Sequence, residues 1–176
     1  EVASISLGNN PPASFSTSST DVSYFDEEKE VRTTLQLLYG DKNYLSLYGV
    51  EILAGRQQMS DSIREYMINE TCMNKLGFQN PHDAVGKMLK LDGKQYPIVG
   101  VVKDFNQRSL KSGINPLAFM GTGGSKGNFS MVHFSLHAVS KENLPKIIKK
   151  VESIWANIYP DDEIRLNFMD DTIEHF

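Results

Sequence analysis

The dipeptide Asp92-Gly93 is the feature that most constrains how this chain can fold. It separates two runs of apolar character, Met88 to Leu91 and Gln95 to Val102. A two-residue hairpin turn needs positive φ at both central residues, and Asp-Gly is among the dipeptides that adopt it most readily. We therefore expect an antiparallel hairpin here, which makes a β-sheet part of the fold.

Two short helices are predicted just before this hairpin. Asn69 can cap a helix from Glu70 to Leu76, and Gly77 can end that helix in the left-handed conformation. Asn80-Pro81 can open a second helix, because proline suits the first helical position, and Gly86 can close it. The middle of the chain is thus predicted to alternate short helices with strands.

The first part of the chain also predicts strands. Val2 to Leu7 alternates polar and apolar residues, so we expect a strand whose apolar face is buried. Gly8 to Asp21 is rich in Pro, Ser, Thr and Asn, and is predicted to be a loop. The sequence assigns no role to this loop. Alternation returns from Val31 to Leu37, and Asp41 is the expected N-cap of a short helix that reaches Tyr48.

The last third predicts a strand, a helix and a strand. Met131 to Ala138 alternates, Leu144 to Ile158 carries an unbroken apolar helical stripe, and Ile164 to Phe168 alternates again. Such a unit normally forms a right-handed crossover between parallel strands. Burial of the stripe would contribute roughly 10 to 20 kcal/mol before the loss of entropy. We therefore expect Ile148→Asp or Val151→Asp to unfold this part of the chain.

Composition limits the function classes. The 176 residues carry 18 basic and 22 acidic side chains, for a net charge of −4, and 40% of the residues are hydrophobic. No basic stripe is visible, which argues against a nucleic-acid surface. No apolar run approaches the roughly 18 residues of a membrane span, and the single Cys72 excludes an intramolecular disulfide. The chain opens in strand-like sequence, which favours a piece of a larger protein.

Several motifs could suggest chemistry, and each has a simpler explanation. The glycine-rich loop Gly121 to Asn128 precedes a strand, whereas a phosphate-binding loop must open a helix. His133 and His137 would lie about 13 Å apart on a strand, too far to share a metal ion. Cys72 lies on the apolar side of a short helix, where a free cysteine usually packs as a small hydrophobe. His82 and His175 have no recognisable partners.

The carboxylates offer no better catalytic candidate. The acidic runs at 26–30, 161–163 and 170–171 lack the spacing of a calcium loop, so we interpret them as solvated surface. Lys103 and Asp104 follow the strand that ends at Val102, and adjacent residues of an extended chain face opposite ways. We predict that this pair ends a strand, and that the chain has no catalytic, cofactor-binding or metal-binding residues.

Several segments, taken in order, resemble a known family. They are YLSLYGVEILAGR at 44–56, INETCMNKLGFQNPHDAVGKML at 68–89, YPIVGVVKDFNQRSLKSGINPLAF at 96–119 and, more loosely, WANIYPDDEIRLNFMDDTIEHF at 155–176. These segments resemble the MacB-like periplasmic core domain of bacterial ABC-transporter permeases of the MacB and FtsX type. In that family a short helix leads to Gly-Arg, an Asn-Glu-Thr helix leads to Leu-Gly and a Pro-containing turn, and a strand ends in Gly-Val-Val-Lys-Asp-Phe.

The resemblance implies an α+β fold with two parts. Residues 1–54 and 118–176 would form a porter-like subdomain with strand-helix-strand units built from both chain ends. Residues 55–117 would form a smaller, inserted, hairpin-rich subdomain of the sabre-like kind. The domain would lie outside the cytoplasm between two membrane helices of an inner-membrane permease.

The resemblance also implies partners and a function. ATP would be bound and hydrolysed by a separate cytoplasmic subunit or domain, and this domain would need no cofactor and carry out no reaction of its own. It would couple ATP hydrolysis to substrate export or to the control of a periplasmic or outer-membrane partner protein. The full permease would be a homo- or heterodimer.

Two other classes of protein stay open. One is a stand-alone secreted or periplasmic binding module, which membrane spans flanking the chain in its gene would exclude. The other is a hydrolase that uses Asp104 with His133 or His137, although no spacing of nucleophile, base and orienting group recommends it.

Overall fold

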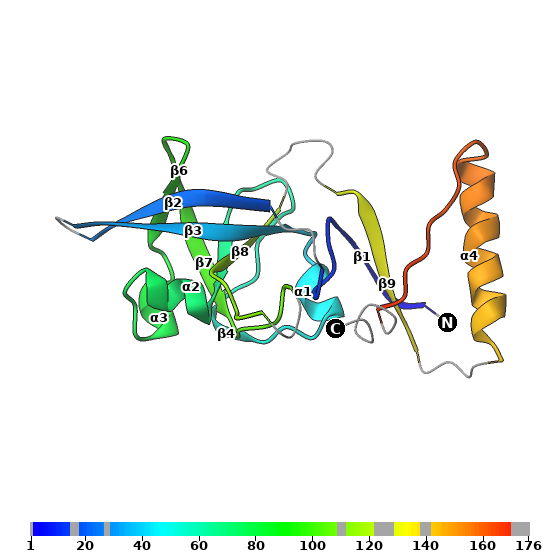
Figure 1. Cartoon of the computed structure of the whole chain (residues 1–176), viewed down its shortest axis with the longest axis horizontal. Helices are drawn as coiled ribbons and strands as arrows, with labels where there is room; N and C mark the ends of the chain where they lie inside the picture. The colour runs from blue at the N-terminus through cyan, green and yellow to red at the C-terminus, as the bar shows by residue number, and fades with distance from the viewer. Residues whose placement is uncertain are drawn as a thin grey trace.

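A computed structural model describes residues 2–14, 18–26, 29–108, 112–121, 129–137 and 142–169. The molecule is elongated, with a large sheet at one end, a small sheet in the middle and a separate helix at the other end (Figure 1). The large sheet has seven strands and the small one has two. The fold class is α+β, as predicted from the resemblance.

The large sheet closes on itself. Its order is β4-β7-β5-β8-β3-β2-β6, and β6 also pairs with β7. The strands β5 and β7 are parallel, as are β3 and β8, whereas the other pairs are antiparallel. The ring of six strands from β7 to β6 encloses the main core, with β4 added on β7. The bounds are Ser18–Asp26 for β2, Lys29–Tyr39 for β3, Ile52–Gly55 for β4, Tyr66–Asn69 for β5, Met88–Leu91 for β6, Lys94–Val102 for β7 and Leu117–Met120 for β8.

The predicted hairpin is confirmed. β6 and β7 pair from Met88↔Pro97 to Leu91↔Lys94, and Asp92 and Gly93 form the turn. Their φ angles are 49° and 77°, the positive values that this turn requires.

The two predicted helices of the middle are also confirmed. Helix α2, Glu70–Lys75, has the Asn69 side chain accepting a hydrogen bond from the Cys72 N–H at its N-terminus. Helix α3, Pro81–Ala84, begins after Asn80, whose side chain accepts a bond from the His82 N–H. Both helices cover one side of the large sheet (Figure 1).

The core of the large sheet draws on residues far apart in the sequence. Strand β5 is buried along its whole length, because it lies between β7 and β8. Residues from every strand of the sheet and from α2 meet there, including Leu35, Ile68, Met73, Leu89 and Val101. A second cluster, around Leu38, Tyr44, Leu45 and Phe119, lies on the side of the sheet that faces α1.

Helix α1, Tyr44–Leu47, begins later than expected. Its N-cap residue is Asn43, so the prediction that Asp41 caps this helix is wrong. The Asp41 side chain turns to the small sheet instead, where it finds several hydrogen-bond donors. Gly49, with a φ of 65°, follows the end of the helix and supplies its left-handed ending.

The small sheet pairs β1, Val2–Gly8, with β9, Met131–Leu136, in antiparallel fashion. Both strands were predicted, but the buried face of β1 was predicted wrongly. Ile5 is 54% exposed and Leu7 is 41% exposed, whereas Ser6 and Gly8 are buried. Helix α1 contacts β1, and the Ser6 hydroxyl and the Leu7 N–H of β1 both bind the Asp41 carboxylate.

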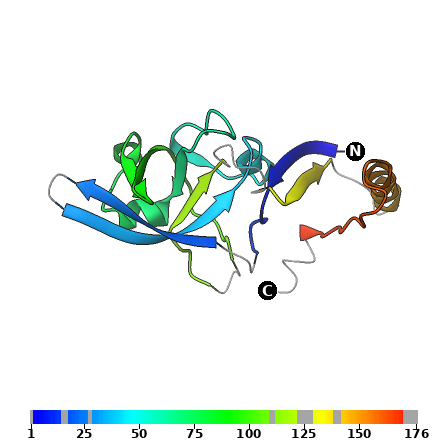
Figure 2. The same ribbon diagram turned by 90° about the horizontal axis from the view of Figure 1, so that it is seen from above.

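Helix α4, Leu144–Ile158, has the predicted bounds but no buried side chain. It lies at the end of the molecule opposite the tip of the β2–β3 hairpin, as two perpendicular views show (Figures 1 and 2). The expected burial of its apolar stripe is therefore wrong. The predicted strand from Ile164 to Phe168 is also absent from the structure, and with it the expected parallel crossover.

The predicted division into 1–54 plus 118–176 and 55–117 stays a prediction. The large sheet contains strands from both parts, since β2, β3 and β8 pair with β5, β6 and each other. The described strands instead divide into the large sheet and the β1–β9 sheet, which are paired separately.

Candidate functional site

The junction between the two sheets is built around Asp41. Its Oδ1 accepts the Ser6 hydroxyl at 2.7 Å and the Asn43 N–H at 2.9 Å. Its Oδ2 accepts the Leu7 N–H at 2.9 Å, and the Asp41 N–H donates to the Leu7 carbonyl at 2.8 Å. Asp41 is only 9% exposed, so these bonds compensate the cost of burying its carboxylate. One side chain thus ties β1 to the segment that leaves β3.

His133 brings β9 to the same junction. It is 8% exposed, its Nδ1 lies 2.8 Å from the Tyr48 hydroxyl, and its ring meets those of Tyr44 and Tyr48 edge to face. Burial lowers the pKa of His133, and the nearby Asp41 carboxylate opposes this only in part. Its Nε2 is buried without a hydrogen-bond partner among the described residues.

Two glycines allow this close approach. Gly8 of β1 and Gly40 after β3 form an isolated antiparallel bridge. A Cβ on Gly8 would lie 2.9 Å from the His133 Nε2, and one on Gly40 would lie 2.7 Å from Tyr44 side-chain atoms. No side chain fits at either position without movement of an aromatic ring. The backbone of each glycine therefore packs directly against aromatic rings.

The junction contains a serine, a histidine and an aspartate, but not in a catalytic arrangement. Ser6 donates to Asp41, and His133 bonds Tyr48. In a hydrolytic triad the histidine would accept from the serine and be oriented by the acid. Ser6 is also fully buried, where no substrate could reach it. The arrangement suits a structural joint.

The side chains of Lys103 and Asp104 bind different partners and do not form a common site. Asp104 accepts the Thr71 N–H at 3.0 Å and the Thr71 hydroxyl at 2.7 Å, and its own N–H donates to Glu70 at 3.0 Å. Lys103 pairs with the exposed Glu51 at 3.1 Å. The prediction that this pair ends a strand is confirmed, since β7 ends at Val102.

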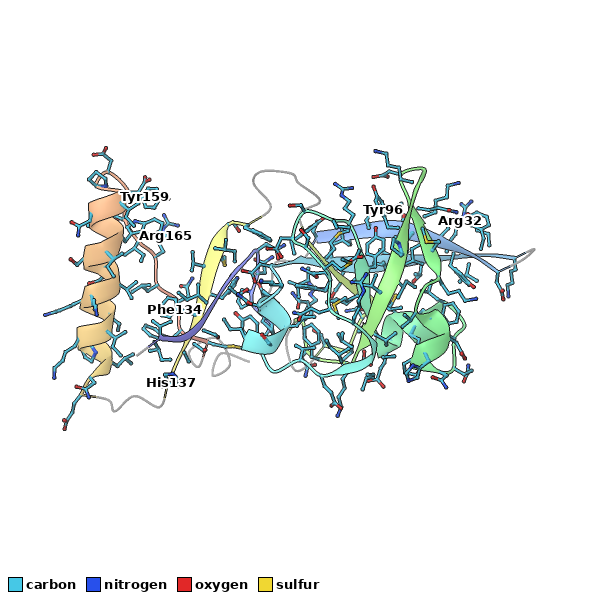
Figure 3. The ribbon with its side chains drawn as sticks, turned by 180° about the vertical axis from the view of Figure 1, so that it is seen from behind. Arg32, Tyr96, Phe134, His137, Tyr159 and Arg165 are labelled. Carbon is cyan, nitrogen blue, oxygen red and sulfur yellow. The ribbon has the colours of Figure 1, made fainter. Side chains whose placement is uncertain are left out.

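The other sequence candidates do not come together. Cys72 is fully buried, and burial raises the pKa of its thiol to about 12. His82 and His137 are exposed, and Figure 3 shows His137 beyond the end of β9. Within the described ranges, no three histidine, cysteine, aspartate or glutamate side chains cluster as metal ligands. His175, residues 122–128 and the acidic pair at 170–171 lie outside the described residues.

An apolar hollow of about 200 Å³ lies beside the junction. Tyr48, whose hydroxyl bonds His133, forms part of its wall together with Pro12, Val50, Phe105 and Met169. The backbone of the 12–14 segment is attached to this region, because the Ala13 N–H donates to the Asn106 carbonyl at 3.0 Å. The joint and the hollow therefore share a residue.

Sequence reasoning did not find this junction. Its residues are scattered from Ser6 to His133, and no local spacing connects them. The one available signal was Asp41 directly after Gly40, and it suggested a helix cap.

Two sheets held together by a polar joint around Asp41 define the fold and the site of this chain. The profile of the family described as MacB-like periplasmic core domain matches residues 4–154. The chain therefore belongs to this family, which forms the periplasmic core of MacB/FtsX-like ABC transporter permeases.

Solved structures share the fold at low sequence identity. The periplasmic region of MacB from Actinobacillus actinomycetemcomitans is 14% identical, with a TM-score of 0.65, over 99% of this chain and 75% of that chain. The extracellular domain of the ABC-type transporter YknZ from Gram-positive bacteria is 14% identical, with a TM-score of 0.60, over 92% and 79% of the two chains. A domain of a putative permease from Porphyromonas gingivalis is 16% identical, with a TM-score of 0.55, over 96% and 80%.

Two further comparisons are negative. No curated protein was found to match the chain. Among the described helices, none has both the length and the apolar character needed to cross a bilayer.

Proposed function

We propose that this chain is the extracytoplasmic coupling domain of an ABC permease, and that it transmits motion driven by cytoplasmic ATP hydrolysis to a substrate or partner protein outside the membrane. Membership in the permease family supports the cellular context. The observation that carries the mechanical part is the Asp41 joint, which links two separately paired sheets through directional hydrogen bonds.

Such a joint is suited to transmission because its geometry has few alternatives. Three hydrogen bonds of Asp41, two of them to its carboxylate, fix the position of β1 relative to the segment that follows β3. Charge-assisted bonds of this kind are shorter and stronger than neutral ones. A displacement of the small sheet would therefore be passed to the large sheet rather than absorbed at the contact. The ATPase would act through the membrane helices of the permease, which would assemble as a dimer.

The test uses the full-length permease with its ATPase. Asp41→Ala removes the two side-chain bonds that hold β1. Asp21→Ala is the matched control, because Asp21 is an exposed aspartate whose only described side-chain bond is to Thr34 on the neighbouring strand. In a strain lacking the permease gene, we expect Asp41→Ala to reach the membrane and to support ATP hydrolysis, but not to restore the function of the deleted gene. Asp21→Ala should restore it.

Two results would contradict the proposal. Full complementation by Asp41→Ala would show that the joint transmits nothing. A gene without membrane-spanning segments on either side of this domain would instead favour a stand-alone secreted or periplasmic binding module.

A further inference from the structure

The environment of His133 is the most unusual feature of the junction. A buried imidazole normally satisfies both ring nitrogens, yet only the Nδ1 of His133 is bonded within the described structure, to the Tyr48 hydroxyl at 2.8 Å. The Nε2 faces Gly8, where even a methyl group would approach to 2.9 Å. At this position, a buried nitrogen lone pair without a donor costs less free energy than a buried N–H without an acceptor. The neutral ring with its proton on Nδ1, donated to Tyr48, fits these contacts.

Protonation would change that balance. The imidazolium carries a second N–H on Nε2, and this donor would point at the backbone of β1 with no acceptor in place. Burying an unpaired donor and a charge together costs far more than burying the neutral ring. The cost can be relieved if β1 and β9 move away from α1, which would admit water to the ring.

The described groups that face His133 do not relieve the cost of burying the imidazolium. From the segment before α1, Asp41 is the one carboxylate, and its oxygens already accept the donors of Ser6, Leu7 and Asn43. From α1 come the phenols of Tyr44 and Tyr48. Burial raises the pKa of both, to about 12 for Tyr48, so neither is charged near neutral pH.

The neighbouring strand adds no charge. Ser6 is the β1 residue paired with His133, and Gly8 lies against its ring. Neither can titrate. Among the described groups at this contact, the imidazole is the one whose ordinary pKa, near 6.5, lies between pH 5 and pH 7.

We propose that protonation of His133 opens the junction, so that mild acid releases the β1–β9 sheet from the large sheet while the large sheet stays folded. The inference concerns the domain by itself and holds whether or not the proposed coupling role is correct. In a permease it would make transmission through the joint depend on the pH outside the cytoplasm.

Hydrogen exchange on the 176-residue chain can test the proposal. The reporters of the joint are the amides of Asn9, which donates to the Tyr39 carbonyl, and of Asp41, which donates to the Leu7 carbonyl. The reference is the amide set of β5, buried between β7 and β8. Because intrinsic exchange varies with pH, the results are compared as protection factors. From pH 7 to pH 5 we expect protection at the joint to fall by at least about fivefold, while β5 is unchanged.

Two variants separate His133 from other titrating groups. His133→Asn cannot be protonated, and its amide nitrogen can replace the Nδ1 donor to Tyr48, so its joint should keep constant protection over this range. His137→Asn is the matched control, because His137 is exposed just past the same strand and should leave the pH response intact.

A second measurement keeps the test decisive if His133→Asn does not fold. The ring signals of His133, followed by NMR in the unmodified chain, should titrate below the ordinary histidine range, with the same midpoint as the loss of protection. Constant protection at the joint, a midpoint that does not follow the His133 ring, or a full pH response in His133→Asn would each overturn the proposal.

Discussion

The carboxylate of Asp104 holds Thr71 through both of its oxygens, one on the backbone N–H at 3.0 Å and one on the hydroxyl at 2.7 Å. A third hydrogen bond joins the same two segments, because the Glu70 carboxylate accepts the Asp104 N–H at 3.0 Å. The end of β7 is thereby attached to the first turn of α2. Asp104, which the sequence offers as a candidate for catalysis, connects a strand to a helix.

Asp104→Ala should therefore destabilise the fold. It leaves the Thr71 N–H and hydroxyl without their acceptor and removes a carboxylate from the N-terminus of α2, at a cost of about 1 to 3 kcal/mol in the free energy of unfolding. Lys103→Ala is the control, because its pair with Glu51 is exposed on both sides and is worth at most about 1 kcal/mol. Urea unfolding measures both, and equal losses would contradict this assignment.

Two glycines with the same φ of +77° should respond differently to alanine. A Cβ on Gly93 meets nothing within 4 Å, so Gly93→Ala should cost about 1 to 2 kcal/mol from backbone strain alone. A Cβ on Gly55 would lie 2.2 Å from the Val99 carbonyl oxygen, which adds a steric clash between strands. We expect about 2 to 5 kcal/mol for Gly55→Ala in chemical denaturation. Similar values for the two variants would show that β4 and β7 can separate easily.

The ion pair of Arg56 and Glu65 predicts a pH dependence of stability. Two hydrogen bonds join them, at 2.7 and 3.0 Å, and these lower the pKa of Glu65 below its usual 4.5. Because the folded pKa is the lower one, the stabilisation is complete above the unfolded pKa and is lost as the pH falls through the folded pKa.

Glu65→Gln should remove that part of the acid sensitivity and cost about 1 to 3 kcal/mol at pH 7. The measurement is the free energy of unfolding from pH 7 to pH 3, compared between the unmodified chain and the variant. Identical slopes below pH 5 would contradict the prediction.

The position of α4 changes what a charged substitution should do there. Val151 is only half-buried, so Val151→Asp should alter the free energy of unfolding by at most about 1 kcal/mol. Ile68 is fully buried in β5, and Ile68→Asp should prevent folding, because an unpaired charge would enter the core. Circular dichroism during thermal unfolding distinguishes the two outcomes. Loss of the fold in Val151→Asp would support the packed helix that the sequence suggests.

Cys72 should be inert in the folded protein. It is fully buried, and its thiol has a pKa raised to about 12 by burial, so little thiolate exists at pH 8. A thiol reagent such as an aromatic disulfide should react with Cys72 only after denaturation. Ser62→Cys, at an exposed position, provides the reactive control.

Short-range chemistry explains the elements that could be predicted. Asn69 and Asn80 cap helices because their side chains reach N–H groups two or three residues away, and Asp92-Gly93 turns because its own backbone permits it. Each of these signals is complete within a few residues. The β6–β7 hairpin and the helices α2 and α3 could therefore be derived without knowledge of the rest of the chain.

Which face each element buries was not a local property. The alternation in β1 correctly indicated a strand, but Ser6 is buried and Ile5 exposed, because the Asp41 carboxylate attracts the polar face. The apolar stripe of α4 correctly indicated a helix, but periodicity does not specify a surface to cover it.

The sequence by itself determined the strands β1, β3 and β9, the β6–β7 hairpin, the capped helices α2 and α3 and, through ordered motifs, the family. Only the tertiary structure decided that the large sheet closes through the pairing of β2 with β6, and that Asp41, His133 and Tyr48 meet at one joint. The physical reason is the sequence separation of the groups that interact. Caps and turns are stabilised by hydrogen bonds between near neighbours, whereas a buried polar joint depends on groups 35 to 85 residues apart, whose contact exists only once the chain has folded.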